Sequence, residues 1–337
     1  MAQDSFSLRT NLPVSLPSRA VRVWRERIIA SILFFAAISS VFTTLTITYI
    51  LFSETVIFFE KAMEMQKISL GQALLEFFTS TDWSPLIEPV GIGILPLLSG
   101  TLTTCFIASC VAVPLGTISA IYLSEFAPAK VREILKPILE ILAGIPTVVY
   151  GYFALLFITP LLQKIILGVQ KFFIPGKEEW EYFQLPGFNM LGAGIAVGLM
   201  VLPYICSLVE DSLQAVPLGL REGSYAMGAT RIQTAFKVLL PAATSGIVAA
   251  YILGFSRAVG ETMIVAVAAG LQPRFTFNPL EAAATTTAFI VSVSLGDLPH
   301  GSLEYQSIFA AGIMLFFATL LMNVIGYFLS RRYREVY

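Results

Sequence analysis

One arginine and one glutamate lie deep inside an apolar stretch, where a charged side chain is expensive to place. Arg257 follows fifteen uncharged residues, and Glu261 comes four positions later. In a single helix, Arg257 would lie about 22 Å from the start, near or past the middle of a hydrocarbon core about 30 Å thick, with Glu261 on the same face. A charge there costs at least about 2.5–3.5 kcal/mol. Two interpretations stay open: a structural ion pair between helices, or an anion pathway, since a guanidinium is always charged and matches oxyanion geometry.

A Gly-x-Pro sequence interrupts another apolar run and could also carry chemistry. Gly144, Pro146 and Thr147 follow one another closely in this run. Proline removes a backbone donor and breaks the helical hydrogen-bond ladder, and broken helices in transporters present backbone groups to substrate. The segment therefore predicts either a substrate-facing break or a simple packing kink.

Motifs for covalent chemistry are missing from the sequence. The only Gly-Lys pair, Gly176-Lys177, lacks the spacing of a P-loop, whose backbone amides cradle phosphates. The sequence has a single histidine, His300, so catalysis or metal binding by histidines is not expected. The three cysteines lie in apolar runs, which argues against disulfides. We expect a chain that hydrolyses no ATP, catalyses no covalent reaction and holds neither a metal nor a cofactor.

The elements that position these residues are apolar segments long enough to cross a membrane. The 337 residues are 56% hydrophobic and 13% charged, whereas soluble domains carry about 25% charged residues. A crossing helix needs about 20 mostly apolar residues. Six segments qualify, at 28–52, 97–123, 135–163, 190–210, 242–271 and 307–330. A shorter apolar stretch, 282–295, predicts a re-entrant or interfacial helix. The predicted fold is an all-α polytopic membrane protein with six transmembrane helices.

Basic residues predict the orientation of these segments, because Lys and Arg are enriched in cytoplasmic loops. With a cytoplasmic N-terminus, 14 of the 21 Lys and Arg residues fall in cytoplasmic segments, including Arg9 and Arg19 in the tail. Both termini are then cytoplasmic. The net charge of −1 and the lack of a basic stripe give no indication of nucleic acid binding. The expected organisation is an N-terminal tail (1–27), a first helix with an outer loop (28–96), a core with a cytoplasmic loop at 211–241 (97–330) and a C-terminal tail (331–337).

The loop between the fourth and fifth segments carries a spaced signature. Glu222, Gly228, Leu240 and Pro241 fall in register over twenty residues, and this spacing resembles the EAA loop of ABC importer permeases. Gly223 stands where an alanine is usual, but it is still small. The resemblance implies helices that dock into a groove of a separate ATPase. The residues expected to mediate this coupling are Arg221, Glu222, Gly228, Arg231, Leu240 and Pro241.

Further segments resemble the PstC-type permeases of phosphate ABC importers, namely 143–151, 256–262, 296–306 and 331–337. The resemblance implies a MetI-like core in the bacterial inner membrane. It also implies a second permease of the PstA type, two ATP-binding subunits of the PstB type, an extracytoplasmic phosphate-binding protein of the PstS type and surrounding lipid. The residues implied in phosphate passage are Gly144, Pro146, Thr147, Arg257, Glu261 and Thr262.

Two alternatives remain at this point. A permease of the same architecture could carry another oxyanion, such as sulfate, molybdate or phosphonate, because the binding protein usually sets specificity in such systems. A passive anion channel or a membrane scaffold is the other possibility. The EAA-like loop argues against the second alternative, since a channel has no use for an ATPase-docking segment.

Overall fold

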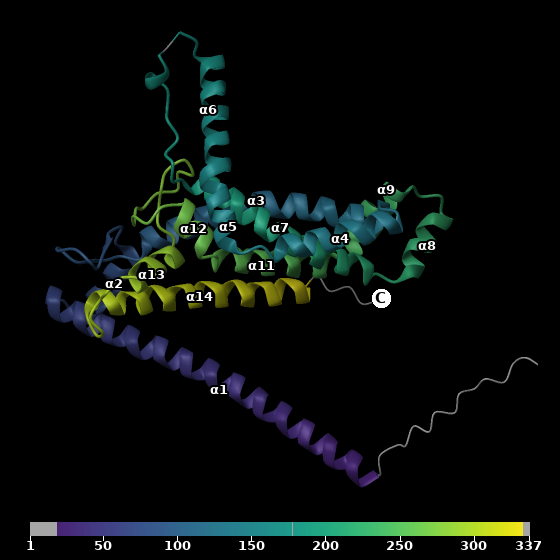
Figure 1. Cartoon of the computed structure of the whole chain (residues 1–337), viewed down its shortest axis with the longest axis horizontal. Helices are drawn as coiled ribbons and strands as arrows, with labels where there is room; N and C mark the ends of the chain where they lie inside the picture. Colours follow the sequence, from purple (N-terminus) through teal and green to yellow (C-terminus); the bar gives the residue numbers. More distant parts are fainter. Residues whose placement is uncertain (1–18, 177, 333–337) are drawn as a thin grey trace, which may run out of the picture. The chain divides into compact units, whose positions relative to one another are not determined.

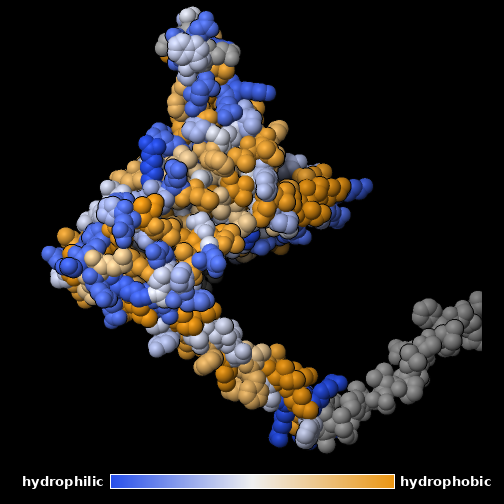
Figure 2. Space-filling model, turned by 60° about the vertical axis from the view of Figure 1, so that its left-hand side comes forward, coloured by the Kyte–Doolittle hydropathy of each residue, from blue (hydrophilic) through white to orange (hydrophobic). Residues whose placement is uncertain are grey.

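The computed structural model describes residues 19–176 and 178–332 and is almost entirely helical. The chain divides into two compact units, Met1–Ile50 and Leu51–Tyr337. Within the described residues, five helices are long and apolar enough to cross a membrane, or six if one bent pair counts as a single span. Figure 2 shows hydrophobic side chains over much of the visible surface, as expected for a chain that contacts lipid.

The first unit consists of the described part of one long helix, α1 (Arg19–Gln66), which continues into the second unit. The predicted first span, 28–52, lies inside this helix, which extends further at both ends. Several threonines donate their hydroxyl protons to the carbonyl four residues earlier, as Thr43 does to Ser39 at 2.9 Å and Thr48 does to Thr44 at 2.8 Å. Such back-bonding satisfies polar side chains where water is absent.

The centre of the second unit is a bundle of four long helices (Figure 1). These are α3 (Leu95–Ile121), α7 (Met190–Gln214), α11 (Thr244–Val259) and α14 (Leu303–Arg332). Small residues let α3 and α7 approach closely. A Cβ added at Gly194 would lie 2.7 Å from Ile107, and one added at Gly198 would lie 2.8 Å from the Ala108 carbonyl oxygen. Close backbone contact through glycine is the usual way in which membrane helices associate.

The predicted third span, 135–163, is not one helix. The chain forms α4 (Ala129–Ala143), α5 (Thr147–Phe153), the π-helical segment η2 (Ala154–Ile158) and α6 (Thr159–Phe173). The helix breaks at Gly144–Pro146, where proline cannot donate to the ladder. The continuous apolar helix therefore runs over Thr147–Phe173, later in the sequence than predicted.

The predicted fifth span, 242–271, is also interrupted. After α11 ends at Val259, the chain turns through residues 260–262 and forms the short helix α12 (Met263–Ala268). On its other side, α9 (Arg231–Thr234), the π-helical η4 (Ala235–Leu239) and α10 (Leu240–Ala242) meet α11 at an angle of 74°. Another helix of the bundle, α3, ends in a further π-helical segment, η1 (Tyr122–Phe126).

The segment predicted as an outer loop, 53–96, is ordered. It contains the end of α1, then α2 (Leu70–Thr79) and a short antiparallel pair, β1 (Trp83–Ser84) and β2 (Gly91–Ile92). Aromatic rings pack at its centre, with Trp83 5.3 Å from Phe289 of α13 (Thr286–Ser294) and 6.2 Å from Phe77 between centroids. The cluster shows that this end of the unit has its own hydrophobic core. The remaining elements are η3 (Glu179–Glu181) and α8 (Leu218–Ala226).

Candidate functional site

Arg257 lies in the last turn of α11 with its side chain exposed. Its Nε donates to the sulfur of Met200 at 3.5 Å, and its guanidinium carbon lies 5.4 Å from the ring centroid of Tyr204. Both neighbours belong to α7. No carboxylate pairs with Arg257 among the described residues. An aromatic face and a thioether orient the guanidinium without neutralising it, so its charge is available to an anion.

Glu261 does not share a helix face with Arg257, so the prediction that the two residues lie on the same face is wrong. The reason is that α11 ends at Val259, and Glu261 lies in the break that follows. Glu261 is only 9% exposed, and its carboxylate accepts hydrogen bonds from the backbone amides of Met263 and Ile264, at 3.1 and 3.2 Å. Its backbone carbonyl accepts from the hydroxyl of Thr287 at 2.6 Å. Glu261 therefore caps α12 and ties it to α13, because free amides at a helix start stabilise a carboxylate.

Thr262 completes the break at the end of α11. Its hydroxyl donates to the carbonyl of Gly260 at 3.2 Å, so the side chain closes the turn locally. The turn leaves Gly260 exposed and Thr262 half-buried.

The break at Gly144, Pro146 and Thr147 is bridged by a side chain. The hydroxyl of Tyr150 in α5 donates across the break to the carbonyl of Leu142 in α4, at 2.9 Å. Beyond the break, α5 packs on α12, where a Cβ at Gly151 would lie 3.0 Å from Val267. The tertiary structure thus brings together the helix that follows Pro146 and the helix that Glu261 caps. Among the described residues, no hydrogen bond or ion pair joins the Gly144–Thr147 break to Arg257.

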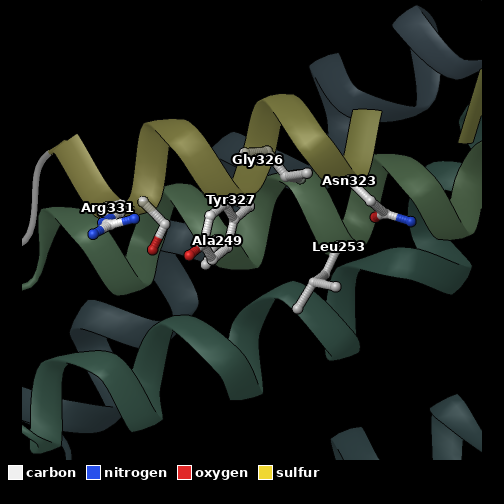
Figure 3. A pocket seen from close by; sticks show the side chains of 8 residues that line it. Ala249, Leu253, Asn323, Gly326, Tyr327 and Arg331 are labelled. Atoms are coloured by element: carbon white, nitrogen blue, oxygen red, sulfur yellow. The ribbon is translucent and has the colours of Figure 1, made fainter. Parts of the chain in front are cut away.

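A groove between α11 and α14 was not predicted from the sequence (Figure 3). The hydroxyl of Ser256 donates to the side-chain oxygen of Asn323 at 3.2 Å, which sets the register of the two helices. The groove has a volume of about 580 Å³. Its lining residues are Ala249, Ile252, Leu253, Asn323, Gly326, Tyr327, Ser330 and Arg331. No local sequence pattern indicates this groove, because the two helices are far apart in the sequence.

The predicted coupling loop consists of two short helices joined by a sharp turn. α8 ends at Ala226, and Gly228 has φ +77°, a left-handed conformation that glycine adopts readily. Thr230 then starts α9 with a capping box. The hydroxyls of Ser224 and Thr234, 2.8 Å apart, connect the two helices. Gly228 therefore lies in the turn between α8 and α9.

The surface of this loop is exposed and partly apolar. Met227 is 88% exposed, and other large apolar side chains beside it are exposed as well, namely Leu218, Tyr225, Ile232 and Phe236. Glu222 and Arg231 are also exposed. Leu240 and Pro241 lie at the C-terminal end of the loop, in α10, where the chain bends by 74° into α11. Several exposed large apolar side chains on one short loop, with charged residues among them, are typical of a site for a protein partner.

Arg221 lies at the base of the loop and is less exposed than Glu222, Gly228 and Arg231, with 18% of its side chain exposed. Its guanidinium pairs with Glu125 of η1 at 3.1 Å and donates to the carbonyl of Leu213 at 2.7 Å. A second ion pair joins Arg132 of α4 to the buried Glu210 of α7 at 2.7 Å. The predicted coupling loop is therefore connected through Arg221 to η1 and to the end of α7, and α4 is joined to α7 by the Arg132–Glu210 pair. The sequence contained no signal for these partners.

Known proteins resemble this chain over most of its length. Residues 112–335 match the family described as binding-protein-dependent transport system inner membrane component. The probable ABC transporter permease YqgH of Bacillus subtilis is 34% identical over 262 residues, which cover 78% of this chain and 79% of that protein. The phosphate transport permease PstC 1 of Mycobacterium tuberculosis is 33% identical, with coverages of 77% and 82%. The probable PstC of Methanocaldococcus jannaschii is 31% identical, with coverages of 77% and 83%.

Solved structures agree on the fold. A chain of a bacterial alginate ABC importer superposes with a TM-score of 0.59 at 14% identity, covering 93% of this chain and all of that one. A chain of the inward-facing MetNI methionine transporter gives a TM-score of 0.50 at 22% identity, covering 72% and 95%. The broken helices, the membrane-crossing bundle and the match over residues 112–335 lead to one conclusion: this chain belongs to the inner-membrane permease subunits of binding-protein-dependent ABC importers.

Proposed function

We propose that this chain forms half of the translocation pathway of an ATP-driven phosphate importer. The observation that carries the proposal is the exposed guanidinium of Arg257, which has no carboxylate partner among the described residues and lies in the last turn of α11. Its relatives named PstC, at 31–33% identity, point to phosphate as the anion. The role of the chain is transport, and ATP hydrolysis belongs to a separate subunit.

The position of Arg257 suits anion passage. It is the fourteenth residue of α11, about 20 Å from the helix start at 1.5 Å per residue. A charge far inside a membrane segment has to be offset, and an anion in transit can do this. Its contacts are the hydrogen bond from Nε to Met200 and the ring of Tyr204, so the terminal amino groups of the guanidinium have no hydrogen-bond partner among the described residues. We infer that Arg257 lowers the barrier for phosphate where water is scarce.

The family resemblance implied that Glu261 and Thr262 take part in phosphate passage, but their hydrogen bonds support a different role. Because Glu261 binds the amides of α12 and the hydroxyl of Thr287, it holds the break beyond Arg257 in shape. The carboxylate acts through its hydrogen bonds rather than by competing for the guanidinium. Gly144, Pro146 and Thr147 provide the second break, and α5 transmits its position to α12.

Coupling to ATP hydrolysis would run through the exposed loop from α8 to α10. The apolar side chains around Met227 and the charged Glu222 and Arg231 are available to an ATPase. Movement of α8 would reach η1 through the Arg221–Glu125 ion pair, and movement of α10 would reach α11 through the 74° bend. The partners in this proposal are a second permease of the PstA type, two ATP-binding subunits of the PstB type and a PstS-type binding protein. Both termini and the coupling loop lie in the cytoplasm.

The test is to purify the intact complex in lipid nanodiscs and measure ATP hydrolysis with each candidate anion and its binding protein. Phosphate should stimulate hydrolysis and be taken up by proteoliposomes, whereas sulfate, molybdate and phosphonates should not. An Arg257→Ala complex serves as the matched control, since it should assemble but fail to transport. Stimulation by another oxyanion alone would disprove phosphate as the substrate. Uptake that persists without ATP would contradict the importer mechanism.

A further inference from the structure

The third crossing segment reaches the end of the bundle before α6 begins. Thr159, the first residue of α6, accepts a hydrogen bond from the side chain of Asn189 at 3.3 Å, and Asn189 is the N-cap of α7. At the other end, Lys136 of α4 lies 3.8 Å from Asp211 near the end of α7. The chain from Lys136 to Thr159 therefore runs alongside nearly the full length of α7. At 25 residues, α7 is about 37 Å long, enough to cross a core of about 30 Å.

α6 continues past this point in a new direction. Figure 1 shows it running at a large angle to α3, α7, α11 and α14. Thr147–Phe173 is apolar and long enough to be one span. However, Thr159 already lies beside the N-terminal end of α7, so the residues after Thr159 do not lengthen the part of the chain that crosses the membrane. α6 thus leaves the bundle at the end opposite the coupling loop.

The surface of α6 is divided into two faces. Leu161, Ile165, Val169 and Phe172 follow the spacing of a helical stripe and are all exposed, Phe172 to 80%. Lys164 lies beside this stripe and is also exposed. A lysine at the edge of an apolar face can extend its ammonium group to water while its stem stays in the apolar region.

The opposite face of α6 is covered by the returning chain. The side-chain amide of Gln163 donates to the carbonyl of Leu185 at 2.9 Å. Gln170 donates to the carbonyl of Phe183 at 3.1 Å and accepts from the Phe183 amide at 2.9 Å. The helix and the segment around residues 182–185 therefore form an arm, which is the projection at the top of Figure 2. Gln163 and Gln170 bond within the arm, whereas the side chains of the apolar stripe stay exposed.

The apolar stripe continues the surface of the membrane-crossing segment before it. Val149 and Phe153 of α5, and Leu156 and Phe157 of η2, are all exposed, and the rings of Phe153 and Phe157 stack at 5.0 Å. Beyond the helix, Trp180 is exposed as well, and tryptophan is enriched where membranes meet water. A continuous apolar surface that begins on a crossing segment and ends at an exposed tryptophan matches a lipid interface.

We propose that α6 lies in the plane of the membrane interface on the side opposite the coupling loop, with Leu161, Ile165, Val169 and Phe172 in the acyl-chain region of the phospholipids. An amphipathic helix of this kind inserts about 5–10 Å below the headgroups. The arm anchors the third crossing segment at this interface, next to the N-cap of α7. The occupant is a phospholipid surface, and the inference holds for any transported anion.

Site-directed spin labelling of the intact complex in phospholipid nanodiscs tests this. After removal of Cys105, Cys110 and Cys206, single cysteines are introduced as Ile165→Cys and Val169→Cys on the apolar stripe. Glu178→Cys, on an exposed position of the loop, is the matched control. Each labelled complex is used only if it assembles and hydrolyses ATP at the parental rate, which separates a folding defect from an effect at the label.

The labels at 165 and 169 should be accessible to oxygen and protected from a water-soluble nickel chelate, with a depth of about 5–10 Å below the phosphates. The label at 178 should show the reverse. Accessibility to the nickel chelate at 165 and 169 would overturn the proposal in favour of a solvent-exposed arm. Protection of both positions from both reagents would overturn it in favour of a protein partner covering the stripe.

Discussion

Gly228 offers a test of the coupling loop in which backbone conformation is the only variable. It has φ +77°, and a Cβ added there would meet no atom within 4 Å. Gly223, in the neighbouring helix α8, also has open space around it, but without a positive φ. The variants Gly228→Ala and Gly223→Ala therefore add the same methyl group to the same exposed loop, once in a left-handed turn and once in a helix.

The two substitutions are expected to change the stability of the loop in opposite directions. An L-residue in the left-handed region costs about 1–2 kcal/mol, whereas replacing a helical glycine by alanine gains about 0.8–1 kcal/mol. The stability of the loop in the two variants should therefore differ by about 2–3 kcal/mol, or roughly 30- to 150-fold in the equilibrium constant for forming it. Gly228→Val should be more severe than Gly228→Ala, because a β-branched residue at positive φ is a genuine outlier.

The assay is a binding titration of the purified ATPase against the permease complex in nanodiscs, together with phosphate uptake and the thermal stability of the permease. If only the native turn binds, Gly228→Ala should weaken apparent affinity by about 5- to 30-fold, as its population falls, and lower uptake while leaving membrane insertion intact. Gly223→Ala should bind at least as well as the parent. Equal affinity and uptake for Gly228→Ala and Gly223→Ala would refute the role of this turn in coupling.

Three further perturbations address the site and its supports. Arg257→Ala should abolish phosphate uptake but allow normal assembly, because the substitution leaves no carboxylate unpaired. Arg257→Lys should retain at most part of the uptake. Full uptake by the alanine variant, measured per assembled complex, would exclude a pathway role for Arg257. Glu261→Gln keeps an acceptor for the α12 amides and should assemble nearly normally, whereas Glu261→Ala should lose about 1 kcal/mol of stability. If thermal denaturation showed the glutamine variant to be as unstable as the alanine variant, the capping role of Glu261 would be wrong. Arg221→Met should destabilise the chain by about 3–5 kcal/mol by leaving Glu125, only 5% exposed, without its partner. Adding Glu125→Gln should recover much of that loss, and no recovery would show that the ion pair is not the cause.

The sequence alone indicated features that depend on local chemistry. Apolar segments long enough to cross a membrane identified the class of protein, and the spacing from Glu222 to Pro241 identified the exposed loop. The turn at Gly228 was predictable because left-handed backbone favours glycine whatever the tertiary structure. The break near Pro146 was predictable for the same kind of reason, since a missing amide proton cannot be supplied from elsewhere.

The tertiary structure decided where helices end and which charges meet. Periodicity placed Arg257 and Glu261 on one face, but this assumed that the helix continued, and the competing hydrogen bonds of Glu261 to α12 ended it at Val259. The pairing of Arg221 with Glu125 joins residues far apart in the sequence, and so does the bond between Ser256 and Asn323. Such partners depend on how helices pack in three dimensions, and no local pattern encodes them. The hydrogen bond between Thr159, the first residue of α6, and Asn189, the N-cap of α7, likewise joins residues far apart in the sequence.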